Sequence, residues 1–271
     1  LLGYDSTFAG AMIGLILAIL VGIIIIGGIK RIASVTEKVV PFMALLYITA
    51  CLYIIGSNFS FIDDAFKLII TEAFNPTAIG VGSTISVLMI GFQRAAFSNE
   101  AGMGTEVMAI GASKNNQPIK SGLVAMIGPL IDTIIVCTIT GLVILLSSEW
   151  IEGSYSGVSL TQKSFSNYLG LAGDYILIFS VATFTLSTMF GYSYYGCKCA
   201  SYLFGANSKF YYRIFYVLTL VLGSVLSLDL AVNIVDAMFA LMAFPTMISA
   251  LYLAPKIKKE ANRYFATLKG K

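Results

Sequence analysis

The chain has 271 residues, of which 58% are hydrophobic and only 11% are charged, and its mean hydropathy is +0.87. A soluble domain is typically about 25% charged, so this chain has too few polar groups to cover a surface in water. The composition predicts an all-α, polytopic membrane protein whose main partner is the lipid bilayer. The net charge of +3 is small and comes without a basic, aromatic-interleaved patch, so we expect no nucleic-acid partner.

Apolar runs predict the membrane crossings in chain order. The first two runs cover residues 8–29 and 39–55, with a short amphipathic link at 32–38 and a polar surface helix between 58 and 78 after them. A segment at 79–112 is apolar at both ends but polar in its middle. Four further runs follow, separated by a long loop, a basic and aromatic connection and a tight turn: 123–146, 175–195, 214–226 and 232–253.

The middle of the 79–112 segment contains the run Ser98-Asn99-Glu100-Ala101-Gly102-Met103-Gly104. Charged groups are costly in lipid, and two glycines weaken a helix at this point. The run is therefore either a loop in water or the break of a discontinuous helix whose unwound backbone lines a cavity.

Basic residues gather on the cytoplasmic side of membrane proteins. If the segment crosses once, 14 of the 17 basic residues share one side; if it does not cross, they divide 3 against 11. The count therefore favours a broken helix with halves at about 79–96 and 105–113. The residues that share the side are Lys30, Arg31, Lys38, Lys114, Lys120, Lys198, Lys209, Arg213, Lys256, Lys258, Lys259, Arg263, Lys269 and Lys271.

The resulting architecture has seven crossings in one transmembrane domain over residues 1–271, with the C-terminus and a basic tail at 256–271 in the cytoplasm. Broken-helix transporters consist of two inverted repeats that each begin with a discontinuous helix. Residues 79–255 correspond to a second repeat, and the two earlier crossings correspond to the end of a first one. We therefore expect missing N-terminal helices of the same protein to carry the partner broken helix.

Several motifs in order resemble the alanine/glycine:cation symporter family, the sodium:alanine symporters. They are the 98–104 run, Gly28-Ile29-Lys30-Arg31-Ile32-Ala33, Glu37-Lys38-Val39-Val40-Pro41-Phe42-Met43-Ala44, Gly122-Leu123-Val124 with Ile131-Asp132-Thr133 and Val136-Cys137-Thr138, Ser187-Thr188 with Gly191-Tyr192-Ser193-Tyr194-Tyr195-Gly196, and Ala240-Leu241-Met242-Ala243-Phe244-Pro245. The resemblance implies a leucine-transporter-type fold, of which this chain covers core helices four to ten. It also implies sodium-coupled symport of alanine or glycine across the plasma (inner) membrane, with Na⁺ as coupling ion and neither another cofactor nor an enzymatic activity.

The candidate site residues follow from the break and from the resemblance. An unwound backbone offers N–H and C=O groups to an amino acid, and helix ends favour opposite charges. The substrate-binding candidates are Phe97, Ser98, Asn99, Ala101, Gly102, Met103, Thr188 and Tyr192. The resemblance places sodium at Ser187 and Thr188, and it implies a Trp at the position of Tyr192. Asp132 is a further candidate for the ion, because an acid inside an apolar span is by default a functional residue.

Each candidate has a structural alternative. Ser187 and Thr188 could bond only to their own helix backbone, and Asp132 could pair with a residue of the missing helices. We expect Arg94 to form a buried ion pair with Glu100, although Glu100 and Glu106 could also serve as proton relays. Asp236 and Asn233 fit the start of the last helix.

Three functional alternatives stay open at this point. The permease could be coupled to protons rather than to sodium. An intramembrane enzyme could use Glu100 and Asp132 as acid and base, although no nucleophile–base pair or metal cluster supports it. The chain by itself could also be inert, because half of the site lies outside it.

Overall fold

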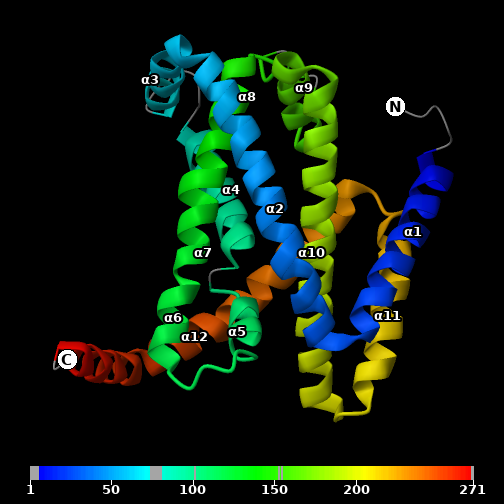
Figure 1. The fold of residues 1–271 in the computed structure, drawn as a ribbon, viewed down its shortest axis with the longest axis vertical. Helices are drawn as coiled ribbons and strands as arrows, with labels where there is room; N and C mark the ends of the chain where they lie inside the picture. Colours follow the sequence, from blue (N-terminus) through cyan, green and yellow to red (C-terminus); the bar gives the residue numbers. More distant parts are fainter. Residues whose placement is uncertain (1–5, 74–80, 101, 152, 154, 270–271) are drawn as a thin grey trace. The chain divides into compact units, whose positions relative to one another are not determined.

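A computed structural model of the chain describes residues 6–73, 81–100, 102–151, 153 and 155–269. All regular structure in these ranges is helical (Figure 1). The chain divides into two compact units, which we treat separately: unit 1 comprises Leu1–Phe74 and Thr138–Leu228, and unit 2 comprises Asn75–Cys137 and Asp229–Lys271.

Unit 1 begins with two long helices that meet at a glycine turn. Helix α1 (Ser6–Ile26) ends where Gly27 N–H bonds to the Ile24 carbonyl, and α2 (Gly28–Ser57) starts at once with Gly28 at φ +68°. This backbone angle favours glycine. The predicted link at 32–38 is therefore wrong, because these residues are helical: Lys, Arg and Glu end an apolar run but are good helix formers.

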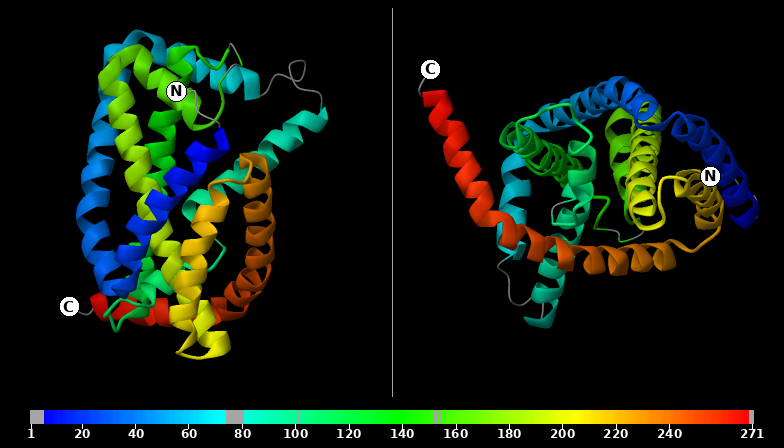
Figure 2. Two further views of the ribbon diagram at one scale, coloured as in Figure 1. Left: turned by 90° about the vertical axis from the view of Figure 1, so that its right-hand side faces the viewer. Right: turned by 90° about the horizontal axis from the view of Figure 1, so that it is seen from below.

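The remaining elements of unit 1 follow the same pattern of long helices and short connections. They are η1 (Phe59–Phe61), α3 (Ile62–Ala73), α8 (Thr138–Ser147), α9 (Val158–Leu169), α10 (Leu171–Phe204) and α11 (Ser208–Gly223). Helix α10 continues through Lys198 to Phe204, so most of the predicted 198–213 connection is helical and only 205–207 forms the turn. Helix α1 packs along α11, as Figure 2 also shows.

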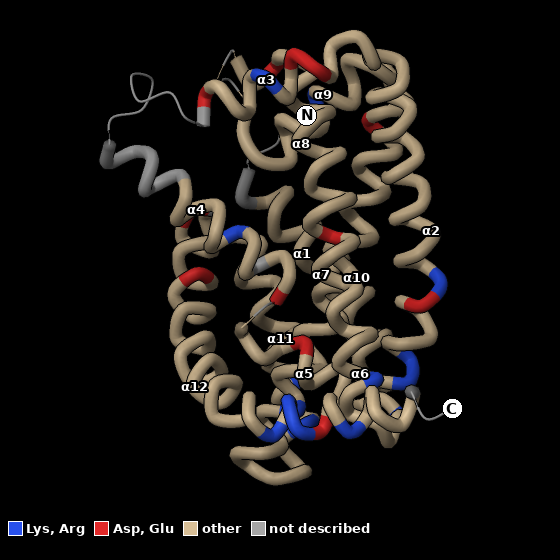
Figure 3. The backbone as a smooth tube through the Cα atoms, turned by 90° about the vertical axis from the view of Figure 1, so that its left-hand side faces the viewer, with Lys and Arg blue, Asp and Glu red and all other residues tan. Residues whose placement is uncertain are grey.

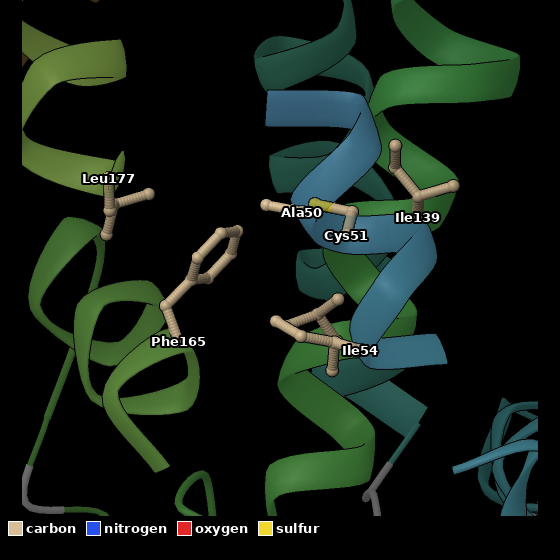
Figure 4. Close-up of a cluster of buried hydrophobic side chains, with 7 residues drawn as sticks. Ala50, Cys51, Ile54, Ile139, Phe165 and Leu177 are labelled. Atoms are coloured by element: carbon tan, nitrogen blue, oxygen red, sulfur yellow. The ribbon is translucent and has the colours of Figure 1, made fainter. Parts of the chain in front are cut away.

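Two apolar clusters stabilise unit 1. In the first, the fully buried Phe165 of α9 lies between Leu177 of α10 and the Ala50–Cys51 turn of α2, with Ile54 and Ile139 alongside (Figure 4). The second joins α1, α2 and α10 through Val21, Ile25, Ile32 and Phe190. Between helices in lipid such contacts act through close packing rather than through removal from water, so these clusters fix the helix register.

Charge is segregated along unit 1. Basic residues lie where α2 begins, and mainly acidic residues lie on α3 and after α8 (Figure 3). Arg213 of α11 joins the basic end, since its guanidinium donates to the carbonyl of Ile26 at 3.3 Å. Within this unit, the structure thus agrees with the side-counting argument made from the sequence.

Unit 2 contains α4 (Val81–Asn99), α5 (Thr105–Ile110), α6 (Pro118–Ala125), α7 (Ile127–Leu130), the π-helical segment η2 (Ile131–Cys137) and nearly all of α12 (Leu228–Lys269). The basic tail predicted from residue 256 onward is helical as part of α12. Large apolar side chains of α12 are exposed, for example Leu251 at 76% and Phe244 at 75%. Such a surface suits lipid and would be costly in water.

Five helices among the described residues are long and apolar enough to cross a bilayer, namely 8–26, 28–57, 118–147, 171–204 and 229–268. The chain is therefore a multi-pass membrane protein by length and composition. The other two predicted crossings correspond to the interrupted pair α4–α5 and to α11, which has only 16 residues, whereas about 20 residues span a bilayer. Seven crossings and the leucine-transporter-type bundle stay predictions.

Candidate functional site

The polar run at 98–104 forms a break between two helices of unit 2. Helix α4 ends at Asn99, and α5 starts at Thr105. Between them Glu100, Gly102 and Gly104 have φ of +51°, +80° and +79°. Positive φ angles end an α-helix and favour glycine. The break that the distribution of basic residues predicts is therefore present in the structure. Its first non-helical residue is Glu100, two positions after the predicted start at Ser98.

The break is packed against α12 at one point. Thr246 donates a hydrogen bond to the carbonyl of Met103 at 3.4 Å, and Met103 is only 4% exposed. A Cβ at Gly104 would meet the Thr246 hydroxyl oxygen at 3.0 Å and its methyl at 3.3 Å. Gly104 is thus required both by its backbone angle and by the proximity of Thr246. Sequence reasoning missed Thr246, because it lies 143 residues away from Met103.

A pair of hydrogen-bonded contacts joins the end of α4 to the π-helical segment η2. Ser98 Oγ bonds to a carboxylate oxygen of Asp132. Asn99 Nδ2 lies 2.7 Å from Thr133 Oγ1, which in turn donates to Asn99 Oδ1 at 3.0 Å. Three predicted site residues, Ser98, Asn99 and Asp132, are therefore brought together. A π-helical turn is uncommon and often marks a functional site.

Two hydroxyls near the break differ in their partners. The single proton of the Thr246 hydroxyl is shared, because Oγ1 lies 2.9 Å from the Met242 carbonyl and 3.4 Å from the Met103 carbonyl, so the bond to Met103 is the weaker branch. Thr105 Oγ1 is buried, and no group of the described residues forms a hydrogen bond with it. A buried polar atom without a partner is costly unless a ligand or water satisfies it. This oxygen suits a hard cation or a polar substrate group.

Arg94 does not form the ion pair expected for it. Its guanidinium contacts both carboxylate oxygens of Asp236 on α12, at 3.4 and 3.2 Å. Of the ion pairs between described residues, the one that involves Arg94 is with Asp236, so the predicted pair with Glu100 is wrong. The physical reason is that Glu100, with its positive φ, has left the helical path on which Arg94 lies.

The other predicted residues lie on α10 in unit 1. Ser187 Oγ donates to the carbonyl of Phe184 at 2.8 Å, which leaves the lone pairs of this oxygen available to a ligand. Thr188 and Tyr192 are half-buried one turn apart on the same helical face. Tyr192 packs edge-on against Tyr195 with ring centroids 5.6 Å apart. The structure describes this group and the α4–α5 break in separate units.

Two predicted substrate-binding positions have no described side chain. Ala101 lies outside the described residues, and the side chain of Phe97 also lies outside them, although its backbone belongs to α4. Gly102 is described: a Cβ built on it would meet no described atom within 4 Å. The backbone at Gly102 is therefore open on that side, as a surface that contacts a small ligand requires.

A polar helix break in a multi-pass helical protein is typical of membrane transporters that use discontinuous helices. The sequence matches the sodium:alanine symporter family over residues 3–271. The chain therefore belongs to this family. The family is one of transporters.

Three relatives illustrate the range of named activities. The sodium/alanine symporter AgcS of Methanococcus maripaludis is 40% identical over 93% of this chain and 56% of its own length. The probable sodium/glutamine symporter GlnT of Bacillus subtilis is 34% identical over 90% and 51%. The sodium/proton-dependent alanine carrier protein of Bacillus sp. strain PS3 is 30% identical over 72% and 47%. The chain spans about half the length of the curated relatives it matches.

Proposed function

We propose that the protein catalyses sodium-coupled symport of a small neutral amino acid, alanine or glycine, across the plasma (inner) membrane by alternating access. The observation that carries this proposal is the glycine-containing break between α4 and α5, in a chain of the sodium:alanine symporter family. An irregular backbone at membrane depth is tolerated where it lines a cavity. The two helix ends at the break supply partial charges of opposite sign for a zwitterion.

The substrate-binding residues of the proposal are Phe97, Ser98, Asn99, Ala101, Gly102 and Met103, together with Thr188 and Tyr192 on α10. The open side of Gly102 supports contact with a substrate as small as alanine. If the resemblance is correct in placing Trp at this position, Tyr192 removes bulk and adds a hydroxyl there. We therefore propose that this position sets the size of the accepted side chain.

Sodium binding is assigned to Ser187, Thr188 and Asp132. Asp132 offers a carboxylate that already accepts a hydrogen bond from Ser98, and hydroxyl and carboxylate oxygens are suitable ligands for a hard monovalent cation. The buried Thr105 hydroxyl is a further oxygen of this kind in unit 2. An ionisable residue within a membrane span is by default a functional candidate.

The test is uptake of labelled alanine into proteoliposomes with a sodium gradient, compared with an equal choline gradient. We expect sodium to drive accumulation and choline to abolish it; undiminished uptake in choline would refute sodium coupling. A proton gradient imposed without sodium tests the proton-coupled alternative, which the name of the Bacillus sp. relative favours. Competition by unlabelled glycine, serine and glutamine defines the substrate class.

The orientation of the protein in the membrane has a separate test. We propose a cytoplasmic C-terminus, because the basic residues of the 256–271 segment favour that side. An epitope placed after Lys271 should be cleaved by protease in inverted membrane vesicles and protected in right-side-out ones. The opposite pattern would reverse the orientation.

A further inference from the structure

A pocket of about 200 Å³ lies at the basic end of unit 1, outside the residues assigned to transport. Its lining residues come from the end of α1, the start of α2, the last turns of α10 and the start of α11. Figure 1 shows these helices and the α1–α2 and α10–α11 turns at one end of unit 1. Three cationic residues line the pocket, Lys198, Lys209 and Arg213, and the described lining residues include no carboxylate.

The three cations come from two helices, and side-chain contacts position two of them, Arg213 and Lys198. Arg213 donates to the Ile26 carbonyl at 3.3 Å, which places its guanidinium at the end of α1. Lys198 Nζ lies 5.4 Å from the ring centre of Tyr194, a cation–π distance. The backbone carbonyl of Lys209 lies 4.0 Å from the sulfur of Cys197. Like charges directed into one small volume repel each other, so the pocket favours an anion.

The opposite wall of the pocket is apolar. Ile25 and Ile32 are buried, and Ile29 is 37% exposed at the rim. A free inorganic anion gains nothing from such a wall. A ligand with a charged group and a hydrocarbon chain can contact both the cations and the isoleucines.

The location restricts the ligand further. Pockets lined by basic residues between membrane helices at the cytoplasmic side are suited to anionic lipid headgroups. The Gly27–Gly28 turn and the 205–207 turn end the apolar helices here, so the pocket lies at the level where headgroups begin. The basic character of this end assigns it to the cytoplasmic leaflet.

We infer that this pocket binds the phosphate group of an anionic membrane lipid, with one acyl chain along the isoleucine wall. Lys198, Lys209 and Arg213 hold the phosphate, and Ile29 contacts the lipid glycerol and upper chain. This inference does not depend on the transported substrate, because none of the lining residues belongs to the proposed substrate or sodium sites.

The test measures lipid retained by the purified protein. Protein in mild detergent is mixed with equal amounts of phosphatidylglycerol and phosphatidylcholine, and bound lipid is counted by native mass spectrometry. We expect preferential retention of phosphatidylglycerol. The double variant Lys198→Gln/Lys209→Gln should bind it roughly tenfold or more weakly, because each cation near a headgroup contributes measurably. Arg213 is left in place because it also bonds to the backbone of α1.

A matched control keeps the same change of net charge. Lys258→Gln/Lys259→Gln removes two basic residues from α12 and should retain phosphatidylglycerol as the unmodified protein does. Equal loss in both double variants would overturn the pocket in favour of non-specific attraction to basic surface. Unchanged retention in the Lys198/Lys209 variant would also overturn it.

Two further arms identify the ligand and guard against misfolding. Ile29→Glu places a carboxylate at the rim without removing a cation, and it should likewise release the lipid; it serves as the test if the lysine variant fails to fold. Inorganic phosphate at millimolar concentration should not displace phosphatidylglycerol. Displacement by phosphate would overturn the assignment to a lipid.

Discussion

Arg94 of α4 and Asp236 of α12 form an ion pair in which the two terminal guanidinium nitrogens, Nη1 and Nη2, contact the carboxylate at 3.4 and 3.2 Å. Nine residues after Arg94, Met103 is held by Thr246, ten residues after Asp236. Helix α12 thus contacts the broken helix twice, once before the break and once inside the break. Two such contacts determine where the non-helical residues lie in unit 2.

We expect this ion pair to stabilise the protein by about 0.5–1 kcal/mol beyond the sum of its parts. A double-mutant cycle with Arg94→Gln and Asp236→Asn measures this coupling in the free energy of unfolding. Lys67→Gln provides the comparison, since Lys67 pairs with Asp64 at 3.6 Å with both side chains more than 70% exposed. A strictly additive cycle for Arg94 and Asp236 would contradict the expectation.

Gly104→Ala should be more destabilising than Gly102→Ala. Both residues have φ near +80°, so each substitution introduces backbone strain of about 1–2 kcal/mol. Only at Gly104 does the new methyl group also meet Thr246. The extra loss should be relieved in the double variant Gly104→Ala/Thr246→Ala, which removes the contacting atoms. Thermal unfolding of the three variants checks this, and equal melting temperatures for the two glycine variants would show that Thr246 is not the cause.

Two variants can show whether Asp132 acts through its negative charge or through its hydrogen bond with Ser98. Asp132→Asn keeps an acceptor for the Ser98 hydroxyl but removes the negative charge. If Asp132 binds sodium, the sodium concentration for half-maximal uptake should rise by about tenfold or more, equivalent to roughly 1.4 kcal/mol. Ser98→Ala keeps the charge and should shift it less. A larger shift for Ser98→Ala than for Asp132→Asn would indicate that Asp132 positions α4 rather than binding sodium.

Thr133 offers a test of positioning at the same place. Thr133→Val removes the hydroxyl that both accepts from and donates to Asn99, whereas Thr133→Ser retains it. We expect the valine variant to lower the maximal rate of alanine uptake several-fold, because the Asn99 amide loses its orientation, each hydrogen bond contributing about 1 kcal/mol. The serine variant should restore most of the rate. Equal uptake by both variants would show that transport does not need the orientation of Asn99 by Thr133.

Phe165→Ala should be strongly destabilising without affecting the transport site directly. The ring is fully buried between α2, α9 and α10, and removal of a buried aromatic side chain typically costs 3–5 kcal/mol. Phe61→Ala is the control, because Phe61 is 61% exposed and should change the free energy of unfolding by less than about 1 kcal/mol. Denaturation in a graded mixture of detergents measures both.

The sequence alone was sufficient to locate the helix break, because its signal is long-range. Lys114, Lys120 and the later basic clusters lie on the same side as the first basic cluster only if the 79–112 segment crosses the membrane. The glycines at 102 and 104 then indicate where the helix is interrupted, and both have positive φ. The ends of α2, α10 and α12 were less predictable, since Lys198 or Lys256 ends an apolar run without ending a helix.

The contacts that hold the break were not predictable in the same way. Arg94 was expected to pair with its sequence neighbour Glu100, but its partner is 142 residues away. Nothing in the local pattern around Thr246 indicates that its hydroxyl contacts Met103. Such contacts depend on how helices pack, and side-chain spacing within one helix carries no information about them.

The long sequence separation between Met103 and Thr246 has a consequence for biosynthesis. A ribosome adds about 5–20 residues per second, and the two partners are 143 residues apart. The newly inserted α4–α5 pair therefore waits for roughly 7–30 s before the helix that fixes it has been made. During that interval Arg94 is without Asp236 and the Met103 carbonyl is without Thr246, so these polar groups need water or other protein groups as partners until α12 has been made.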